Sequence, residues 1–161
     1  HVSIAKDSMS QEESTLEVFK ATAKGSGWAT KVNITGSEWT IQADEIEEDG
    51  GTNTGPNPMQ YFAASLASCQ NEQAQVVAEE MELSIDSMDI SLEIDLDLAG
   101  FMGMAAHSND SYKKVKLNHT VGGNITAEEA AKMGAAVDSR CPILGLLRNS
   151  GCEIDSSWAK V

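Results

Sequence analysis

The stretch GGTNTGPNPMQYFAASLASC, residues 50–69, contains the change from loop to helix around which the rest of the fold is arranged. Its first part is rich in Gly, Asn and Pro, the residues that form turns and structured loops. Pro58 then stands where a helix begins, because the first turn of a helix does not need the N–H group that proline lacks. Apolar residues recur at helical spacing from Met59 onward. The pattern predicts a structured loop over residues 45–58 and a helix of about 24 residues from Pro58.

Cys69 lies on or beside the apolar stripe of this helix, and its thiol has two interpretations. The stripe consists of Met59, Phe62, Ala63, Leu66, Ala74, Val77 and Met81. A buried cysteine commonly acts as a small apolar side chain. A cysteine that does chemistry instead needs a stabilised thiolate, since the thiolate is the nucleophile. The helix alone leaves both interpretations open.

Short β-like runs precede this helix, and a mixture of strands and helices follows it. Residues 1–14 lack periodicity and predict a flexible arm, so we expect a single domain over residues 15–161. Runs at 15–23, 28–35 and 38–44 are separated by glycines, which is typical of a meander of hairpins. Further strands are expected at 88–98, where apolar and acidic residues alternate, at 112–121 and at 152–161. The predicted class is α+β.

Two shorter helices are predicted in the last third of the chain. Thr126 and Glu129 have the spacing of a capping box, which begins a helix that continues through about Val137. Cys141 precedes Pro142 at the start of a short helix, for which Gly151 is a plausible terminator.

Composition excludes several function classes. The chain has 161 residues and a net charge of −14, from 11 basic and 25 acidic side chains. Nucleic-acid binding depends on clustered Lys and Arg, so this balance argues against it and favours an acidic, solubilising surface. No apolar run has the roughly 18 residues of a membrane helix, and the polar start does not resemble a signal peptide. We therefore expect a cytoplasmic protein.

Three cysteines, Cys69, Cys141 and Cys152, are too few for a secreted disulfide framework. No CxxC motif is present, and His107 and His119 are far from any metal-like spacing. Both histidines are interpreted as surface or strand residues, and Cys152 as a structural residue of the last strand. We expect neither a metal nor another cofactor.

Cys69 and Cys141 are the two thiols that could react together. In peroxide reduction a thiolate attacks the O–O bond and becomes a sulfenic acid, which a second thiol condenses with to form a disulfide. A helix N-terminus at Cys141 favours an anion there. Cys69, in the middle of a helix, would need a cation from elsewhere in the fold. The sequence permits their proximity but does not establish it.

Residues 50–69, together with RCPILGLL at residues 140–147, resemble the OsmC/Ohr family of thiol-dependent peroxidases. The resemblance implies an intertwined homodimer with antiparallel sheets packed on a long central helix and active sites at the subunit interface. It also implies that Cys69 attacks organic hydroperoxides and that Cys141 resolves the intermediate. A dithiol such as a lipoyl group would then reduce the disulfide, with no metal or prosthetic group.

The chain departs from the family pattern at two positions. Met59 stands where classical members carry a glutamate, and the arginine of their N-terminal β region is missing, since no arginine precedes Arg140. Lys24 lies in the corresponding neighbourhood and could stabilise the thiolate, but without the planar fork of a guanidinium. The chain is therefore more similar to the OsmC-like branch that diverges from the classical peroxidases.

These departures keep a second function open, that of a small-molecule-binding or stress-response protein with little or no peroxidase activity. In either case the expected substrate pocket is apolar. Its expected residues are Met59, Phe62, Leu66, Phe101 and Met102. A hydrophobic core explains the same side chains equally well.

Overall fold

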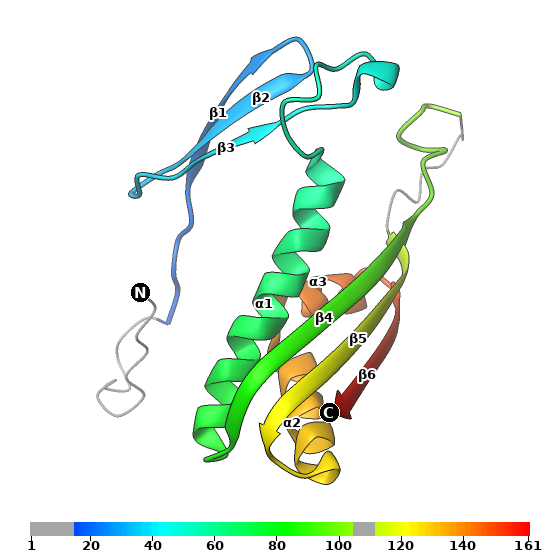
Figure 1. Cartoon of the computed structure of the whole chain (residues 1–161). Helices are drawn as coiled ribbons and strands as arrows, with labels where there is room; N and C mark the ends of the chain where they lie inside the picture. The colour runs from blue at the N-terminus through cyan, green and yellow to red at the C-terminus, as the bar shows by residue number, and fades with distance from the viewer. Residues whose placement is uncertain (1–14, 105–111) are drawn as a thin grey trace. The chain divides into compact units, whose positions relative to one another are not determined.

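The computed structural model describes residues 15–104 and 112–161, so the predicted arm at 1–14 and His107 lie outside the described residues. Contacts between residues divide the chain into two compact units, with the boundary along the chain between Asn57 and Pro58, and each unit is described by itself. A single domain over 15–161 stays a prediction. The first unit contains β1 (Ala21–Ser26), β2 (Ala29–Ile34), β3 (Thr40–Ala43) and the 3-10 turn η1 (Glu47–Asp49). The second contains α1 (Pro58–Glu80), β4 (Ser84–Leu96), β5 (Tyr112–Asn124), α2 (Ala127–Arg140), α3 (Pro142–Asn149) and β6 (Glu153–Lys160) (Figure 1).

The first unit is an antiparallel meander in the order β1-β2-β3. Its first strand begins six residues later than the run predicted at 15–23. The strand extends to Ser26 because the turn is made by Gly27, whose φ of 63° favours a residue without a side chain. Lys24 of β1 lies directly opposite Lys31 of β2.

The loop after β3 is structured, as the turn-rich sequence at 45–58 predicts, and one buried carboxylate orders it. Asp44 is 2% exposed and accepts hydrogen bonds from the backbone N–H and hydroxyl groups of both Thr52 and Thr54. It also accepts one from the backbone N–H of Glu45, and its own N–H donates to the carbonyl oxygen of Pro56. These contacts hold both ends of the loop that leads to α1.

The second unit is a sheet in the order β4-β5-β6, with α1, α2 and α3 on one face (Figure 1). β4 and β5 are antiparallel and longer than predicted. β6 pairs with β5 in parallel, because α2 and α3 carry the chain back to the starting end of β5. The acidic residues Asp89, Glu93 and Asp95 lie on the exposed face of β4, and the alternating apolar residues face the helices.

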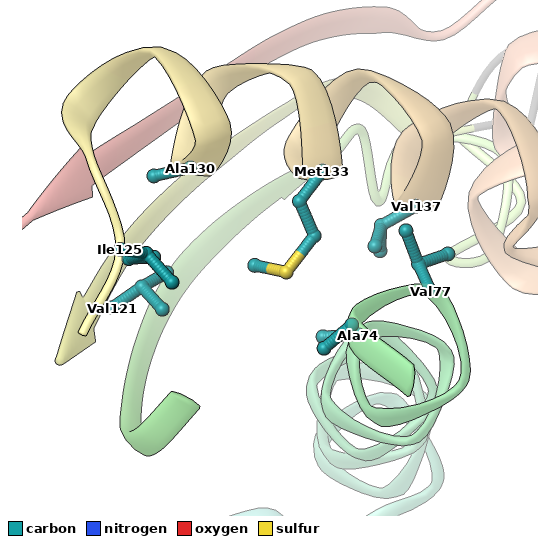
Figure 2. Close-up of a cluster of buried hydrophobic side chains, with 8 residues drawn as sticks. Ala74, Val77, Val121, Ile125, Ala130, Met133 and Val137 are labelled. Atoms are coloured by element: carbon teal, nitrogen blue, oxygen red, sulfur yellow. The ribbon is translucent and has the colours of Figure 1, made fainter. Parts of the chain in front are cut away.

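Two apolar clusters fill the space between the helices and this sheet. We name the first the α2 cluster; Figure 2 shows its residues, which are Ala74, Val77, Ala78, Val121, Ile125, Ala130, Met133 and Val137. We name the second the thiol cluster, which consists of Leu66, Val115, Leu117, Cys141, Leu144, Leu147 and Cys152. Both cysteines singled out by the sequence belong to or contact the thiol cluster.

The helix boundaries follow the local signals. The predicted capping box is confirmed, since Thr126 accepts from the N–H of Glu129 and the Glu129 carboxylate accepts from the N–H of Thr126. α2 continues to Arg140, beyond the predicted end at Val137. Among the described helices, none combines the length and apolar character that spanning a membrane requires.

Candidate dithiol site

Cys69 of α1 and Cys141 between α2 and α3 lie side by side. Their sulfur atoms are 3.0 Å apart, and the Cys141 thiol donates a hydrogen bond to the sulfur of Cys69. Both cysteines are free; Cys141 is 1% exposed and Cys69 is half-buried. The spacing is beyond a covalent S–S bond but within the distance that a small side-chain movement closes.

Local backbone geometry explains the position of Cys141. Its N–H donates to the carbonyl of Val137, which completes the last turn of α2. Its own backbone is extended and serves as the N-cap of α3, whose first residue is Pro142. Because proline disfavours helical geometry in the residue before it, the Cys-Pro dipeptide forces the break between the two helices at this thiol.

The environment of Cys69 favours the protonated thiol. Burial raises the pKa of Cys69 to about 12, together with the hydrogen bond and charge interaction with Cys141. Glu72 adds a smaller effect in the same direction, whereas a hydrogen bond from the backbone N–H of Ile143 lowers the pKa. Ile143 lies in the first turn of α3. The sequence predicted that the N-terminus of this helix would stabilise a thiolate on Cys141. In the structure, one backbone N–H group of its first turn donates to Cys69 instead.

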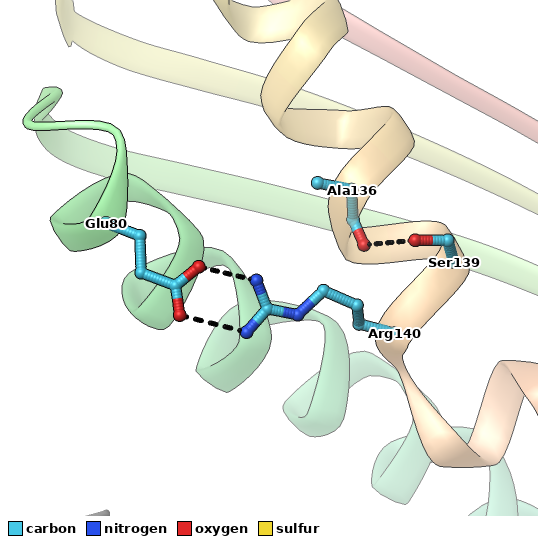
Figure 3. A network of polar contacts seen from close by, with 4 residues as sticks. All are labelled: Glu80, Ala136, Ser139 and Arg140. Atoms are coloured by element: carbon cyan, nitrogen blue, oxygen red, sulfur yellow. Dashed lines mark hydrogen bonds and ion pairs between the residues drawn. The ribbon is translucent and has the colours of Figure 1, made fainter. Parts of the chain in front are cut away.

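Both arginines of the chain are engaged elsewhere. Arg140 forms a two-pronged ion pair with Glu80, at 2.6 and 3.1 Å, that joins the ends of α2 and α1 (Figure 3). Arg148 donates to the backbone carbonyl of Asp138. Lys24 lies in β1 of the first unit, where it is exposed.

The expected apolar pocket residues fall into two groups. Met59, Phe62 and Leu66 share α1 with Cys69; Leu66 is fully buried, and Phe62 stacks on Tyr112 with ring centroids 4.8 Å apart. The Tyr112 hydroxyl donates to the sulfur of Met59 at 3.1 Å. Tyr112 was not identified from the sequence, because nothing local links the start of a strand to this helix.

Phe101 and Met102 form the other group. They lie in the segment after β4 and are 78% and 62% exposed, so they are not part of the buried cluster around the thiols.

Cys152 is separated from the thiol pair by the length of α3. It is 6% exposed and follows the helix that Cys141 precedes. Eight helical residues span about 12 Å, so the two backbones lie at opposite ends of the helix. Burial raises the pKa of Cys152. This environment suits the structural role expected from the sequence.

His119 is the residue whose environment differs most from expectation. It belongs to a strand, as predicted, but it is 2% exposed and hydrogen-bonded to Gln70 on α1. Its position could have been found from strand parity, since it lies two residues from both Leu117 and Val121, which are core residues. Within residues 15–104 and 112–161, no group of three or more His, Cys, Asp or Glu side chains is arranged to hold a metal ion.

Comparison with known proteins gives one family model and several solved structures that match this chain. The family model described as OsmC-like protein matches residues 51–157, which include both thiols. An organic hydroperoxide resistance protein from Legionella pneumophila has a similar structure, with a TM-score of 0.68, 23% identity, and coverage of 89% of this chain and 98% of that one. Another from Elizabethkingia anophelis gives a TM-score of 0.71 at 20% identity, covering 92% of this chain and 100% of that one.

An OsmC-like protein from Mycoplasma pneumoniae has a TM-score of 0.73 at 14% identity, over 90% of this chain and 98% of its own. At these identities the structural similarities establish the fold. No curated protein matches the chain in sequence.

Proposed function

Because the chain belongs to the OsmC-like protein family, we propose that it is a thiol-dependent peroxidase that reduces organic hydroperoxides. The observation that carries the proposal is the pair of free thiols, Cys69 and Cys141, with sulfur atoms 3.0 Å apart. Similar folds belong to proteins described as organic hydroperoxide resistance proteins, which supports the same class of substrate.

The reaction needs two steps on the enzyme. The Cys69 thiolate attacks the outer oxygen of the hydroperoxide, the O–O bond breaks, and an alcohol leaves after taking up a proton. The sulfenic acid on Cys69 then condenses with the Cys141 thiol, which forms the disulfide and releases water. A dithiol reductant, such as a lipoyl group, restores both thiols by thiol–disulfide exchange and is itself oxidised to a disulfide.

The attacking thiol needs a source of stabilisation besides Ile143. A pKa of about 12 leaves little Cys69 thiolate at neutral pH, so an approaching cation is required. We assign this role to Lys24, in a homodimer whose subunits complete each other's sites. Lys31, opposite Lys24 on β2, adds a second ammonium on the same face of the sheet. A cytoplasmic location, where a dithiol stays reduced, suits this chemistry.

Steady-state turnover tests the proposal. Consumption of cumene hydroperoxide with dihydrolipoamide as reductant is measured for the full chain and for the Cys69→Ser, Cys141→Ser and Cys152→Ser variants. We expect Cys69→Ser to abolish turnover, Cys141→Ser to block disulfide formation, and Cys152→Ser to retain turnover. Wild-type rates in Cys69→Ser would contradict the proposal.

A small-molecule-binding function without peroxidase activity is the second candidate. It is favoured by the raised pKa of Cys69 and by Met59, whose sulfur accepts a hydrogen bond from Tyr112. A compound that binds the folded state in preference to the unfolded state raises the melting temperature. A rise in melting temperature with unreactive apolar alcohols, combined with no hydroperoxide turnover, would support this candidate over the first.

A further inference from the structure

A stacked pair of rings lies in the interior of the second unit. The imidazole of His119 on β5 and the indole of Trp158 on β6 have ring centroids 3.8 Å apart and planes inclined by 7°. His119 Nδ1–H donates to the carbonyl of Ser157 at 2.8 Å, and its Nε2 lies 3.0 Å from the side-chain amide of Gln70. On the other side, Trp158 Nε1–H donates to the Asp138 carboxylate at 3.3 Å.

The two ends of this assembly adjoin the two thiols along the chain. Gln70 directly follows Cys69 on α1, and Asp138 lies three residues before Cys141 in the last turn of α2. A continuous series of contacts therefore runs from one cysteine-bearing segment through β5 and β6 to the other.

This polar series separates the two apolar clusters. His119 lies between Leu117 of the thiol cluster and Val121 of the α2 cluster, and Gln70 lies between Leu66 and Ala74 in the same way. Gln70 is fully buried, and one end of its side-chain amide has no hydrogen-bond partner among the described residues; the same holds for Asp138 Oδ1. Apolar side chains would fill this layer without leaving polar atoms unpaired, so stability alone does not account for it.

The hydrogen bond between Gln70 on α1 and His119 on β5 can form with either charge state of the imidazole. Burial lowers the pKa of His119, which favours the neutral ring. With its proton on Nδ1, a neutral ring accepts at Nε2, and the NH2 end of the Gln70 amide donates to it. A charged ring donates from Nε2, and the carbonyl end of the same amide accepts. A half-turn of the amide preserves the contact.

We propose that the His119–Trp158 stack, with Gln70 and Asp138 at its ends, positions Cys69 and Cys141 for disulfide formation. The four are positioning residues, since they act through the backbone next to each thiol. The inference rests on the proposed function, because it concerns the disulfide that this function forms. It predicts that the stack sets the effective concentration of one thiol at the other, and hence the reduction potential of the pair.

The test is equilibration of the full chain with reduced and oxidised glutathione, followed by alkylation and mass spectrometry of the Cys69–Cys141 disulfide. We expect the equilibrium constant for disulfide formation to fall roughly tenfold in Gln70→Leu, or about 30 mV. Trp158→Phe, which keeps an aromatic ring against His119 but loses the hydrogen bond to Asp138 and part of the packing of the indole, is the second variant if Gln70→Leu does not fold. Ser156→Ala is the control, since it removes a buried hydroxyl of β6 outside the stack and is expected to keep the wild-type constant.

A spectroscopic measurement separates positioning from general stability. Replacing Trp28 and Trp39 with Phe leaves Trp158 as the only tryptophan of the chain. Oxidation of the thiols should then change its fluorescence reversibly, and Gln70→Leu should remove that response. A folded Gln70→Leu or Trp158→Phe variant whose thiol pair keeps the wild-type reduction potential would overturn this inference and leave the proposed function standing. Absence of the disulfide in the wild type at every glutathione ratio would overturn the proposed function and the inference with it.

Discussion

Gly134 of α2 lies against the indole of Trp158 so closely that a β-carbon on it would overlap the ring. The absence of a side chain at this position lets α2 approach β6 and brings Asp138 within reach of the indole nitrogen. We expect Gly134→Ala to lower the free energy of unfolding by about 1–3 kcal/mol, because the core must be displaced to admit the methyl group. Urea denaturation followed by circular dichroism measures the change.

Gly145 of α3 is the matched control for this prediction. Apart from its chain neighbours and the backbone of its own helix, no atom of the described residues lies within 4 Å of a β-carbon placed there. Gly145→Ala should therefore stabilise the chain by up to about 1 kcal/mol, the helix propensity difference between the two residues. Equal effects of the two substitutions would contradict the close approach of α2 to Trp158.

His119 should make stability depend on pH. Burial lowers its pKa from the usual 6.5, so the unfolded chain binds a proton at a higher pH than the folded chain does. The stabilising contribution of the neutral His119 ring to the free energy of unfolding is therefore fully present above pH 6.5. It is lost as the pH falls through the pKa of His119 in the folded chain. Urea midpoints from pH 8 to pH 5 should fall more steeply for the wild type than for His119→Phe. Parallel pH profiles would show that His119 is not buried as a neutral ring.

Asp44 should control the order of the loop before α1. Hydrogen bonds from Thr52 and Thr54 hold the pKa of Asp44 well below its usual range. The contribution of the Asp44 carboxylate to the free energy of unfolding is therefore present above pH 3.8 and is lost only in stronger acid. Asp44→Asn replaces one acceptor oxygen with a donor and should expose residues 45–57 to proteolysis at neutral pH. Asp49→Asn, at an exposed position in η1, is the control and should leave cleavage unchanged. Wild-type protection in Asp44→Asn would contradict the role of this carboxylate.

Lys24 should affect the reactivity of Cys69 if it stabilises the thiolate. An opposite charge nearby lowers a pKa by one unit or more, and so its loss should slow alkylation of Cys69 at pH 7 roughly tenfold. Lys24→Ala is compared with Lys20→Ala, which removes an exposed ammonium just before β1. Identical alkylation rates in the two variants would contradict a role for Lys24 in stabilising the Cys69 thiolate.

Elements with local causes could be predicted from the sequence, whereas contacts between distant segments could not. Pro58 and the Thr126–Glu129 box mark helix starts that the structure confirms, because a proline or a capping side chain acts within one turn. Cys69 and Cys141 were identified by motif, but the Ile143 N–H on Cys69 depends on how α3 packs against α1. The contact between Gln70 and His119 was missed for the same reason, since 49 residues separate them.

The most direct test is peptide mapping of the reduced chain after treatment with one equivalent of cumene hydroperoxide. Alkylation of the remaining thiols before digestion prevents exchange during the analysis. The proposed mechanism predicts a Cys69–Cys141 disulfide with Cys152 still alkylated. Cys69 and Cys141 both recovered as alkylated thiols, with the hydroperoxide unconsumed, would contradict it.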